Sequence, residues 1–212
     1  MNDASPIHTK LERVVLASTN PGKIKDFQVL IGNHPIQLIP QTALNIPEIP
    51  ETGHTFVENA LLKARNAAAL SGLPAIADDS GLVVDALAGA PGLHSARYAG
   101  PNASADENIQ KLLNELAKIP NVNRKARFYA VLVFVRYPED PTPLIAEGTW
   151  EGEILEEPTG ENGFGYLPVF YSTQHHCSAA LLSTEERTKI NHRGQAFRKL
   201  IAQYLTLIEN AC

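Results

Sequence analysis

Cysteine is scarce in this 212-residue sequence, which contains only Cys177 and Cys212. These two residues form no CxxC pattern of the kind that marks a metal or redox site. Proteins stabilised by disulfides usually carry several cysteine pairs and belong to oxidising compartments. The scarcity therefore predicts a protein of a reducing compartment, and we expect a cytoplasmic location.

Long hydrophobic runs are also missing. The longest apolar run, Phe128–Val135, has 8 residues, whereas a membrane-spanning helix needs about 20. The segment Met1–Lys10 is polar and lacks the apolar core of a signal peptide. We therefore expect neither a membrane partner nor a secretory signal, and we predict that residues 1–12 form a flexible extension before the fold.

Positive charge is not in excess. Lysine and arginine total 18, aspartate and glutamate total 23, and the net charge is -5 with neutral histidine. Because nucleic-acid-binding surfaces need clustered positive charge, nucleic acid is not an expected partner. A small anionic ligand is compatible with this total, since nearby cations decide its binding. The composition is ordinary for a globular protein, and no repeat or linker divides the chain, so we predict a single domain over residues 1–212.

Two adjacent carboxylates, Asp78 and Asp79, follow the apolar residues Ala75–Ala77 and precede Ser80 and Gly81. This order predicts a buried strand that delivers the acids to its exposed end, where ligands bind in open α/β sheets. Neighbouring residues of an extended chain point to opposite faces. We therefore expect different roles for the two acids, one toward a metal or a water and one toward the local structure. A simple polar turn is the alternative.

A predicted strand, Arg13–Ser18, runs into the polar turn Thr19–Lys23 and then into a predicted helix, Ile24–Ile31. The first amides of a helix lack partners within the helix and attract anions, and Lys23 adds a positive charge. The arrangement predicts an anion site. It is not a Walker A loop, because Ile24 stands where Ser or Thr would bind magnesium. An ordinary turn with a surface lysine is the alternative.

Three Ser/Thr-x-x-Glu patterns predict helices that begin with a capping box. They are Thr55 with Glu58, Ser104 with Glu107, and Ser183 with Glu186. The cap explains Glu58 structurally, although a ligand role stays open for it. Glu51 lies in the Pro-rich loop Pro40–Gly53 and has no such explanation.

The remaining strands follow from short β-branched and apolar runs. They are predicted at Ile36–Ile39, Leu73–Ala77, Arg127–Arg136, Leu144–Ala146 and Thr149–Ile154. Asp140–Pro141 suits a hairpin connection, so the strands around it are expected to be antiparallel. The sequence therefore predicts an α/β fold with a mixed central sheet and flanking helices.

Two further stretches indicate ligand binding. Phe164 and Tyr166 stand among the glycines of Glu157–Pro168 and suit a flat ligand that lies against the backbone. Folding back onto the core is the alternative for these aromatics. A cluster of potential cations then precedes the last helix, as a phosphate clamp or as solvated surface. Its members are Arg187, Lys189, His192 and Arg193.

Taken together, five motifs in order resemble the inosine triphosphate pyrophosphatase family, most closely its bacterial branch. They are Ala17–Lys23, Glu51–Asn59, Ala77–Gly81, Gly163–Tyr166 and His192–Gln195. The stretch Ser95–Gly100 matches too, and the resemblance covers the chain from Val14 to about Leu200. It implies two α/β lobes around a long mixed sheet, an active-site cleft between them, and a homodimer.

The resemblance also implies magnesium-dependent hydrolysis of ITP, dITP and XTP to the monophosphate and pyrophosphate. By the family pattern, Asp79 is the catalytic residue, and Asp79 and Glu51 are the magnesium ligands. The substrate-binding positions that the resemblance implies are Ser18, Thr19, Asn20, Pro21, Gly22, Lys23, Ser80, Phe164, Gly165, Tyr166, Leu167, Arg187, His192 and Arg193.

Roles for these positions follow from their chemistry. Cations at Lys23, Arg187 and Arg193 would neutralise phosphates. Phe164 would stack on the purine, and His192 and Arg193 would donate hydrogen bonds to its 6-keto oxygen. Adenine offers no acceptor there, so it would leave a buried donor unpaired at a cost of roughly 1–3 kcal/mol.

The sequence departs from the family at four positions. The family commonly has Asp at Leu167, Lys at Arg187, Ser at Asn191 and Glu at Leu181. Leu167 removes a polar group beside the base-binding loop. If the family's Asp contacts the ligand through its side chain, this departure implies relaxed base specificity or reduced activity. If the Asp contacts the ligand only through its backbone, no change is implied. The alternatives are therefore a nucleotide-binding protein of the same fold with little turnover, and a pyrophosphatase with relaxed specificity.

Overall fold

The structure, a computed structural model, describes residues 12–209. The predicted N-terminal extension over residues 1–12 lies outside this range except for its last residue. That residue, Glu12, is already the first residue of strand β1 (Glu12–Ala17), so the predicted C-terminal boundary of the extension is wrong by one residue. Cys212 also lies outside the described residues.

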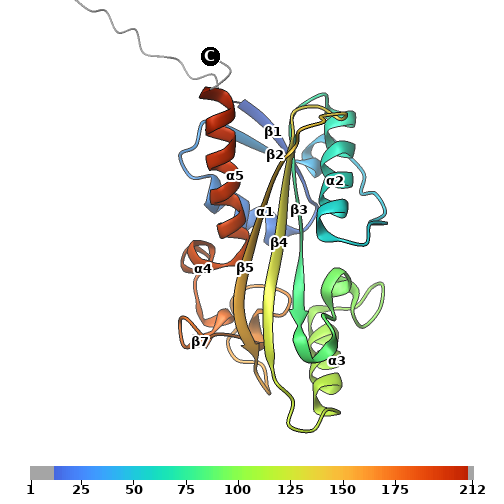
Figure 1. The fold of residues 1–212 in the computed structure, drawn as a ribbon, viewed down its shortest axis with the longest axis vertical. Helices are drawn as coiled ribbons and strands as arrows, with labels where there is room; N and C mark the ends of the chain where they lie inside the picture. The colour runs from blue at the N-terminus through green and yellow to red at the C-terminus, as the bar shows by residue number, and fades with distance from the viewer. Residues whose placement is uncertain (1–11, 210–212) are drawn as a thin grey trace, which may run out of the picture.

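A seven-stranded sheet forms the centre of the described chain, in the order β2-β1-β3-β4-β5-β6-β7 (Figure 1). Its strands are β1 (Glu12–Ala17), β2 (Ile36–Pro40), β3 (Ala75–Val84), β4 (Lys125–Val135), β5 (Leu144–Ile154), β6 (Phe170–Ser172) and β7 (Cys177–Ser178). Strand β1 pairs in parallel with β2 and β3, and the other pairs are antiparallel. The predicted mixed sheet is confirmed.

Helices flank this sheet. They are α1 (Pro21–Ile31), α2 (Phe56–Ser71), α3 (Ala105–Ala117), α4 (Thr184–Ile190) and α5 (His192–Glu209). Short 3-10 helices are η1 (Gln41–Leu44), η2 (Asp85–Leu87), η3 (Gly92–Arg97), η4 (Leu167–Val169) and η5 (Ala179–Leu181). All three predicted capping boxes form, at the starts of α2, α3 and α4.

The upper part of the sheet is covered on both faces (Figure 1). Val14 and Leu16 of β1 join a buried cluster with α1 and α5, whereas Val15 and Ala17 join a cluster with α2. This alternation follows from the period of two along a strand. The alanines of α2 on the buried face, such as Ala64, let the helix lie close to the sheet.

A second lobe lies where β3, β4 and β5 extend beyond these helices (Figure 1). Leu82 and Phe128 on the strands, together with Leu112 on α3, belong to a separate buried cluster that includes Trp150 and Phe170. The long strands therefore belong to both lobes, and the predicted two-lobed α/β architecture is confirmed.

The strand that carries the two acids does not end at them, which corrects the prediction. Asp78 and Asp79 lie in the middle of β3, paired with Leu132 and Val131 of β4. Their exposures are 1% and 6%, so neither acid stands at an exposed strand end or in a polar turn. The antiparallel partner keeps the backbone extended, and cations from other elements compensate the buried charges.

Two other predicted boundaries are wrong. The segments Leu144–Ala146 and Thr149–Ile154 form the single strand β5, because Glu147 and Gly148 keep their pairing with β4. Helix α1 begins at Pro21 rather than at Ile24, since proline suits the first position of a helix.

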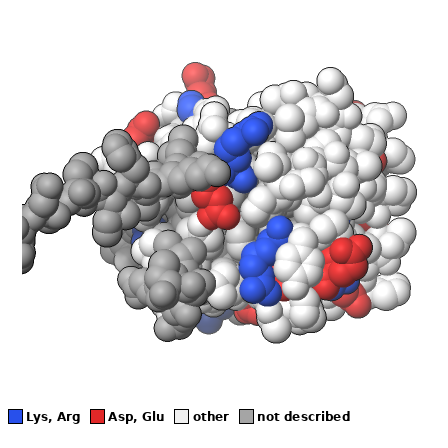
Figure 2. Space-filling model, turned by 90° about the horizontal axis from the view of Figure 1, so that it is seen from above, with Lys and Arg blue, Asp and Glu red and all other residues white. Residues whose placement is uncertain are grey.

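The outer surface of the described chain has neither a membrane-spanning helix nor, on the face seen from above, a continuous basic patch (Figure 2). Among residues 12–209, no helix is long and apolar enough to cross a membrane. On the face seen from above, the described Lys and Arg side chains and the described Asp and Glu side chains form separate spots among uncharged residues (Figure 2). This face therefore offers no continuous basic surface within the described chain.

Candidate active site

A cleft of about 1120 Å³ lies where the pairing of β1 with β3 stops. The two strands pair only from Val15–Ala17 to Ala75–Ala77, and the chain then leaves the sheet through the turn before α1. Beyond this pairing the edge of β3 on that side is free of strand β1 from Asp78, until Leu82 donates to Ser95 and Val83 forms a bridge with Pro91. Ligands bind in α/β sheets at such a break in strand order.

The turn before α1 is fixed by its own side chains. The Oδ1 of Asn20 accepts hydrogen bonds from the backbone N–H of Gly22 at 2.9 Å and of Lys23 at 3.1 Å. The Oγ of Ser18 accepts from the N–H of Asn20, and the hydroxyl of Thr19 donates to Glu48. The prediction of unpartnered helix amides is therefore wrong for Gly22 and Lys23. The lysine side chain supplies the positive charge of this turn.

Asp78 anchors a buried ionic network on one face of β3. Its Oδ2 lies 3.1 Å from the Nζ of Lys23 and accepts from the Nε of Arg193 at 3.0 Å. The Nη1 of Arg193 donates to Asp26 at 2.7 Å and its Nη2 donates to Ser80 at 3.1 Å. Burial opposes ionisation of Asp78, but Arg193 and Lys23 outweigh it and hold the pKa of Asp78 well below its usual range.

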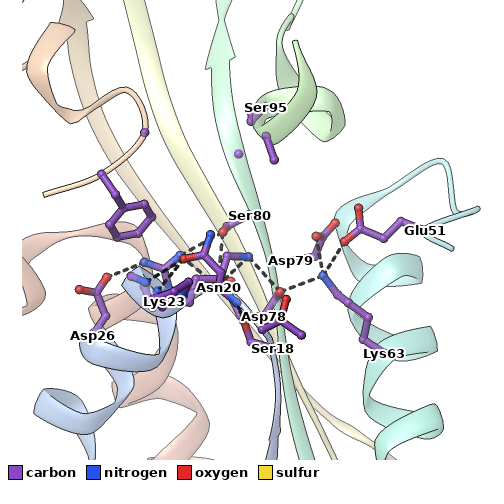
Figure 3. Close-up of a pocket in the computed structure, with 18 of the residues that line it drawn as sticks. Ser18, Asn20, Lys23, Asp26, Glu51, Lys63, Asp78, Asp79, Ser80 and Ser95 are labelled. Atoms are coloured by element: carbon purple, nitrogen blue, oxygen red, sulfur yellow. Dashed lines mark hydrogen bonds and ion pairs between the residues drawn. The ribbon is translucent and has the colours of Figure 1, made fainter. Parts of the chain in front are cut away.

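Asp79 faces the other side of β3, toward α2 (Figure 3). Its Oδ1 lies 2.8 Å from the Nζ of Lys63, which also lies 2.9 Å from the Oε1 of Glu51 and 3.0 Å from the carbonyl oxygen of Asp78. The expectation that the two acids point to opposite faces is confirmed. Burial raises the pKa of Asp79; burial also opposes the charge of Lys63, but the two carboxylates outweigh it and raise its pKa.

The structure also separates the two glutamates that the sequence left as alternatives. Glu58 is exposed and accepts hydrogen bonds from the N–H groups of His54 and Thr55 at 2.8 Å as the helix cap. Glu51 lies in the cleft beside Asp79, and Arg97 donates to its other oxygen at 3.3 Å. Only Glu51 of this pair stands near Asp79.

The other end of the cleft is aromatic. The ring of Phe164 lies directly over the Cα of Gly22, where a Cβ would overlap it. Tyr166 is buried, and its hydroxyl donates to the carbonyl oxygen of Ser95 at 2.9 Å. Leu167 is buried beside Gly163 in the lower lobe. Phe164 therefore faces the cleft with its ring over the turn, whereas Tyr166 mainly ties the loop to the core.

His192 and Arg187 complete this end. The imidazole of His192 is stacked on Phe128, with ring centroids 4.9 Å apart, and its Nδ1 has no hydrogen-bond partner among the described residues. Burial and the nearby Arg193 lower its pKa well below the usual value, so the ring is neutral at pH 7. Arg187 is buried and donates to the carbonyl oxygen of Leu182 at 3.2 Å.

All sixteen residues proposed from the sequence line the cleft. They are Ser18, Thr19, Asn20, Pro21, Gly22, Lys23, Glu51, Asp79, Ser80, Phe164, Gly165, Tyr166, Leu167, Arg187, His192 and Arg193. The turn, the acidic strand and the loop before η4 thus meet in space although they are far apart in the chain.

Sequence reasoning missed Lys63 and Asp26, which also line the cleft. A signal existed for Lys63, because it falls on the same face of its helix as Ala60, Ala64 and Ala67 and interrupts an apolar row. Asp26 offered no comparable signal. Asp26 is buried against Arg193, which is far away in the sequence. Only the tertiary structure brings these two residues together.

Acidic and basic side chains balance in the cleft. The basic ones are Lys23, Lys63, Arg97, Arg187 and Arg193, and the acidic ones are Asp26, Glu48, Glu51, Asp78 and Asp79. The described residues contain no group of three or more His, Cys, Asp or Glu side chains that could hold a metal ion by themselves. A metal at Asp79 and Glu51 would need further ligands from water or from a bound molecule.

A family model for the Ham1 family matches residues 14–203. The chain belongs to the Ham1 family. Its predicted resemblance to the inosine triphosphate pyrophosphatase family is confirmed by curated relatives. One of these relatives is a dITP/XTP pyrophosphatase from Shigella flexneri. It is 50% identical over 191 residues, which cover 90% of this chain and 97% of that protein.

A second relative is a dITP/XTP pyrophosphatase from Xanthomonas campestris pv. campestris strain 8004. It is 52% identical over 190 residues, which cover 90% of this chain and 96% of that protein. The solved structure of a HAM1 protein from Coxiella burnetii matches this fold with a TM-score of 0.85 at 49% identity. It covers 92% of this chain and 98% of that one, so this chain shares the Ham1 architecture over nearly its whole length.

Proposed function

We propose that this protein hydrolyses non-standard purine nucleoside triphosphates, among them dITP, ITP and XTP, to the monophosphate and pyrophosphate. The observation that carries the proposal is a single cleft with carboxylates and lysines at one end and an aromatic ring with buried nitrogen donors at the other. One end suits a triphosphate and the other suits a purine. The printed names of the two relatives, both dITP/XTP pyrophosphatases, support the same substrates.

The phosphate end rests on two lysines. The Nζ atoms of Lys23 and Lys63 lie 3.2 and 3.0 Å from one acceptor, the carbonyl oxygen of Asp78. Two ammonium groups that share one acceptor lie close together in the cleft, and their charges would attract phosphate oxygens there. Arg193 is a weaker candidate for direct phosphate contact, because Asp78, Asp26 and Ser80 already occupy three of its donors.

Asp79 and Glu51 fit a divalent cation. Their oxygens converge on one point, since both lie within 2.9 Å of the same ammonium nitrogen. Magnesium prefers carboxylate oxygens and typically takes its other ligands from substrate phosphates and water, which agrees with a donor pair that is too small to cage an ion. A bound divalent cation would supply positive charge and lower the pKa of a coordinated water.

Asp79 is the residue that we assign to water activation. Hydrolysis adds a water oxygen to the α-phosphorus, breaks the bond to the bridging oxygen and releases pyrophosphate, while the water proton must leave. We assign to the carboxylate of Asp79 the orientation of that water and the acceptance of its proton. A divalent cation at Asp79 and Glu51 would help by lowering the pKa of the coordinated water.

Base recognition is assigned to Phe164 and His192. The ring of Phe164 offers a stacking surface, and the neutral imidazole of His192 offers one N–H donor to a 6-keto oxygen. Leu167, the departure from the family, is accommodated in the apolar core of the lower lobe. We propose that keto purines are preferred despite this departure. The homodimer is a further proposal from the resemblance, and the cytoplasmic location and the single domain over residues 1–212 are further proposals from the sequence composition.

The test is pyrophosphate release in the presence of Mg²⁺, with dITP and XTP compared against dATP, dGTP and dTTP. We expect faster release from dITP and XTP than from dATP and dTTP, whereas dGTP shares the 6-keto oxygen and shows whether the 2-amino group is rejected. Equal rates on all five would keep the hydrolysis and overturn the base preference. No release from any, with nucleotide still bound in equilibrium dialysis, would replace the proposal by the binding-protein alternative.

A further inference from the structure

The ammonium group of Lys63 is completely engaged by oxygen acceptors. It donates to Asp79 at 2.8 Å, to Glu51 at 2.9 Å and to the carbonyl oxygen of Asp78 at 3.0 Å. A lysine has three N–H donors and no acceptor, so these contacts use all of them. The close-up view places the Nζ of Lys63 between the two carboxylates (Figure 3).

The acceptors around this nitrogen are hard oxygen atoms of the type that divalent cations prefer. Two carboxylates and a carbonyl oxygen form a typical partial shell for magnesium or manganese. The ammonium therefore stands at the place where such an ion would meet Asp79 and Glu51. Both charges cannot share that place, because a lysine and a divalent cation a few ångströms apart would repel each other strongly in a partly buried site.

We propose that Lys63 fills this cation position while no triphosphate is bound, holding Asp79 and Glu51 in place and keeping the free protein from binding a divalent cation tightly. The proposal rests on the proposed function for the identity of the ligand that frees the lysine. When a triphosphate is present, its oxygens supply the acceptors that Lys63 gives up at the carboxylates. The protein then has a free lysine for the phosphates and a free carboxylate pair for the cation.

The surroundings of Lys63 agree with such an exchange. Its side chain is 16% exposed and lines the cleft, so the ammonium can turn toward a ligand without moving the helix. Through the carbonyl oxygen of Asp78 it is adjacent to Lys23, which places its alternative acceptors at the phosphate end. Asp78, in contrast, keeps Lys23 and Arg193 as partners and needs no cation.

The test is a Mn²⁺ titration of the protein without nucleotide, with free Mn²⁺ followed by electron paramagnetic resonance. We expect weak binding to the unmodified protein and binding tighter by about tenfold or more to Lys63→Met, since removing the ammonium leaves Asp79 without this counterion and Glu51 with Arg97 alone. Lys63→Arg keeps the charge and should bind as weakly as the unmodified protein. Lys25→Met, which removes an exposed lysine on α1 outside the cleft, is the matched control and should change nothing.

Unchanged or weaker Mn²⁺ binding by Lys63→Met, with a melting temperature that shows a folded protein, would overturn the proposal. If that variant does not fold, Lys63→Gln is titrated in its place, with the same expectation. Pyrophosphate release is measured separately on the unmodified protein. Its absence would defeat the proposed function and leave the metal titration interpretable, so the two failures are distinguishable.

Discussion

Asp78 and Asp79 are chemically identical neighbours on β3, yet they lie in very different surroundings. Asp78 faces α1 and α5 and is held by Lys23 and Arg193 in a network that is almost closed to solvent. Asp79 faces α2 and shares Lys63 with a second carboxylate. Because side chains alternate between the faces of a strand, one acid lies in a closed ionic network and the next faces Lys63 and Glu51, where we propose the chemistry.

The largest expected effect is on folding and comes from Asp78→Asn. The change leaves Lys23 in a buried site without its counterion and Arg193 with Asp26 alone, and breaking a buried ion pair in this way costs about 3–5 kcal/mol. Urea denaturation should therefore show a large loss in the free energy of unfolding. A loss no larger than that of Asp79→Asn would contradict the assignment of Asp78 to stability.

The reverse pattern is expected for Asp79→Asn. Turnover of dITP should fall by about 10²-fold or more, the usual scale for a positioned acid–base group, while the urea midpoint changes little. Asp85→Asn is the matched control, because Asp85 pairs with Arg127 near the surface and does not line the cleft. Turnover of Asp79→Asn equal to that of this control would remove Asp79 from the mechanism.

Glu51 and Glu58 give a second contrast, between a carboxylate in the cleft and a carboxylate that caps a helix. Glu51→Gln should lower turnover, because it weakens the carboxylate pair at Asp79, whereas Glu58→Gln should leave turnover unchanged and affect only the start of α2. Steady-state rates of the two variants at saturating Mg²⁺ measure the contrast. Equal losses in both would show that the loop before α2, rather than the carboxylate of Glu51, matters.

The smallest expected effects are on proton binding. Burial raises the pKa of Asp79, whereas the nearby cations outweigh burial and lower the pKa of Asp78. In the protein without added metal, carboxyl NMR should therefore find Asp79 titrating above the ordinary aspartate value of about 3.9 and Asp78 below it. The same pKa for both carboxyl groups would contradict the opposite shifts expected for Asp78 and Asp79.

These shifts have opposite consequences for stability. As the pH falls below the ordinary aspartate value, the unfolded chain takes up a proton at Asp78 that the folded chain does not, so stability is lost. At Asp79 the folded chain takes up the proton first, which slightly favours folding as the pH falls through its raised pKa. Of these two acids, Asp78 should therefore contribute to acid unfolding, and Asp79→Asn should hardly alter it.

Much of this protein follows from local sequence. The three capping boxes, the β-branched strand runs and the mixed sheet were predicted correctly, because turns, caps and alternation depend on residues close together in the chain. The motifs around Lys23, Asp79 and His192 identified the family for the same reason. Lys23, Asp79 and His192 themselves line one cleft.

The tertiary structure decided which charges are buried and with what partners. It placed Asp78 in the middle of β3 and in contact with Arg193, which is 115 positions away in the sequence. It also brought the ammonium group of Lys63 into contact with both Asp79 and Glu51. It also placed Glu51, and not Glu58, in the cleft. A buried charge is stable only beside its counterion, and these counterions come from other elements of the fold, so no local pattern in the sequence could have specified them.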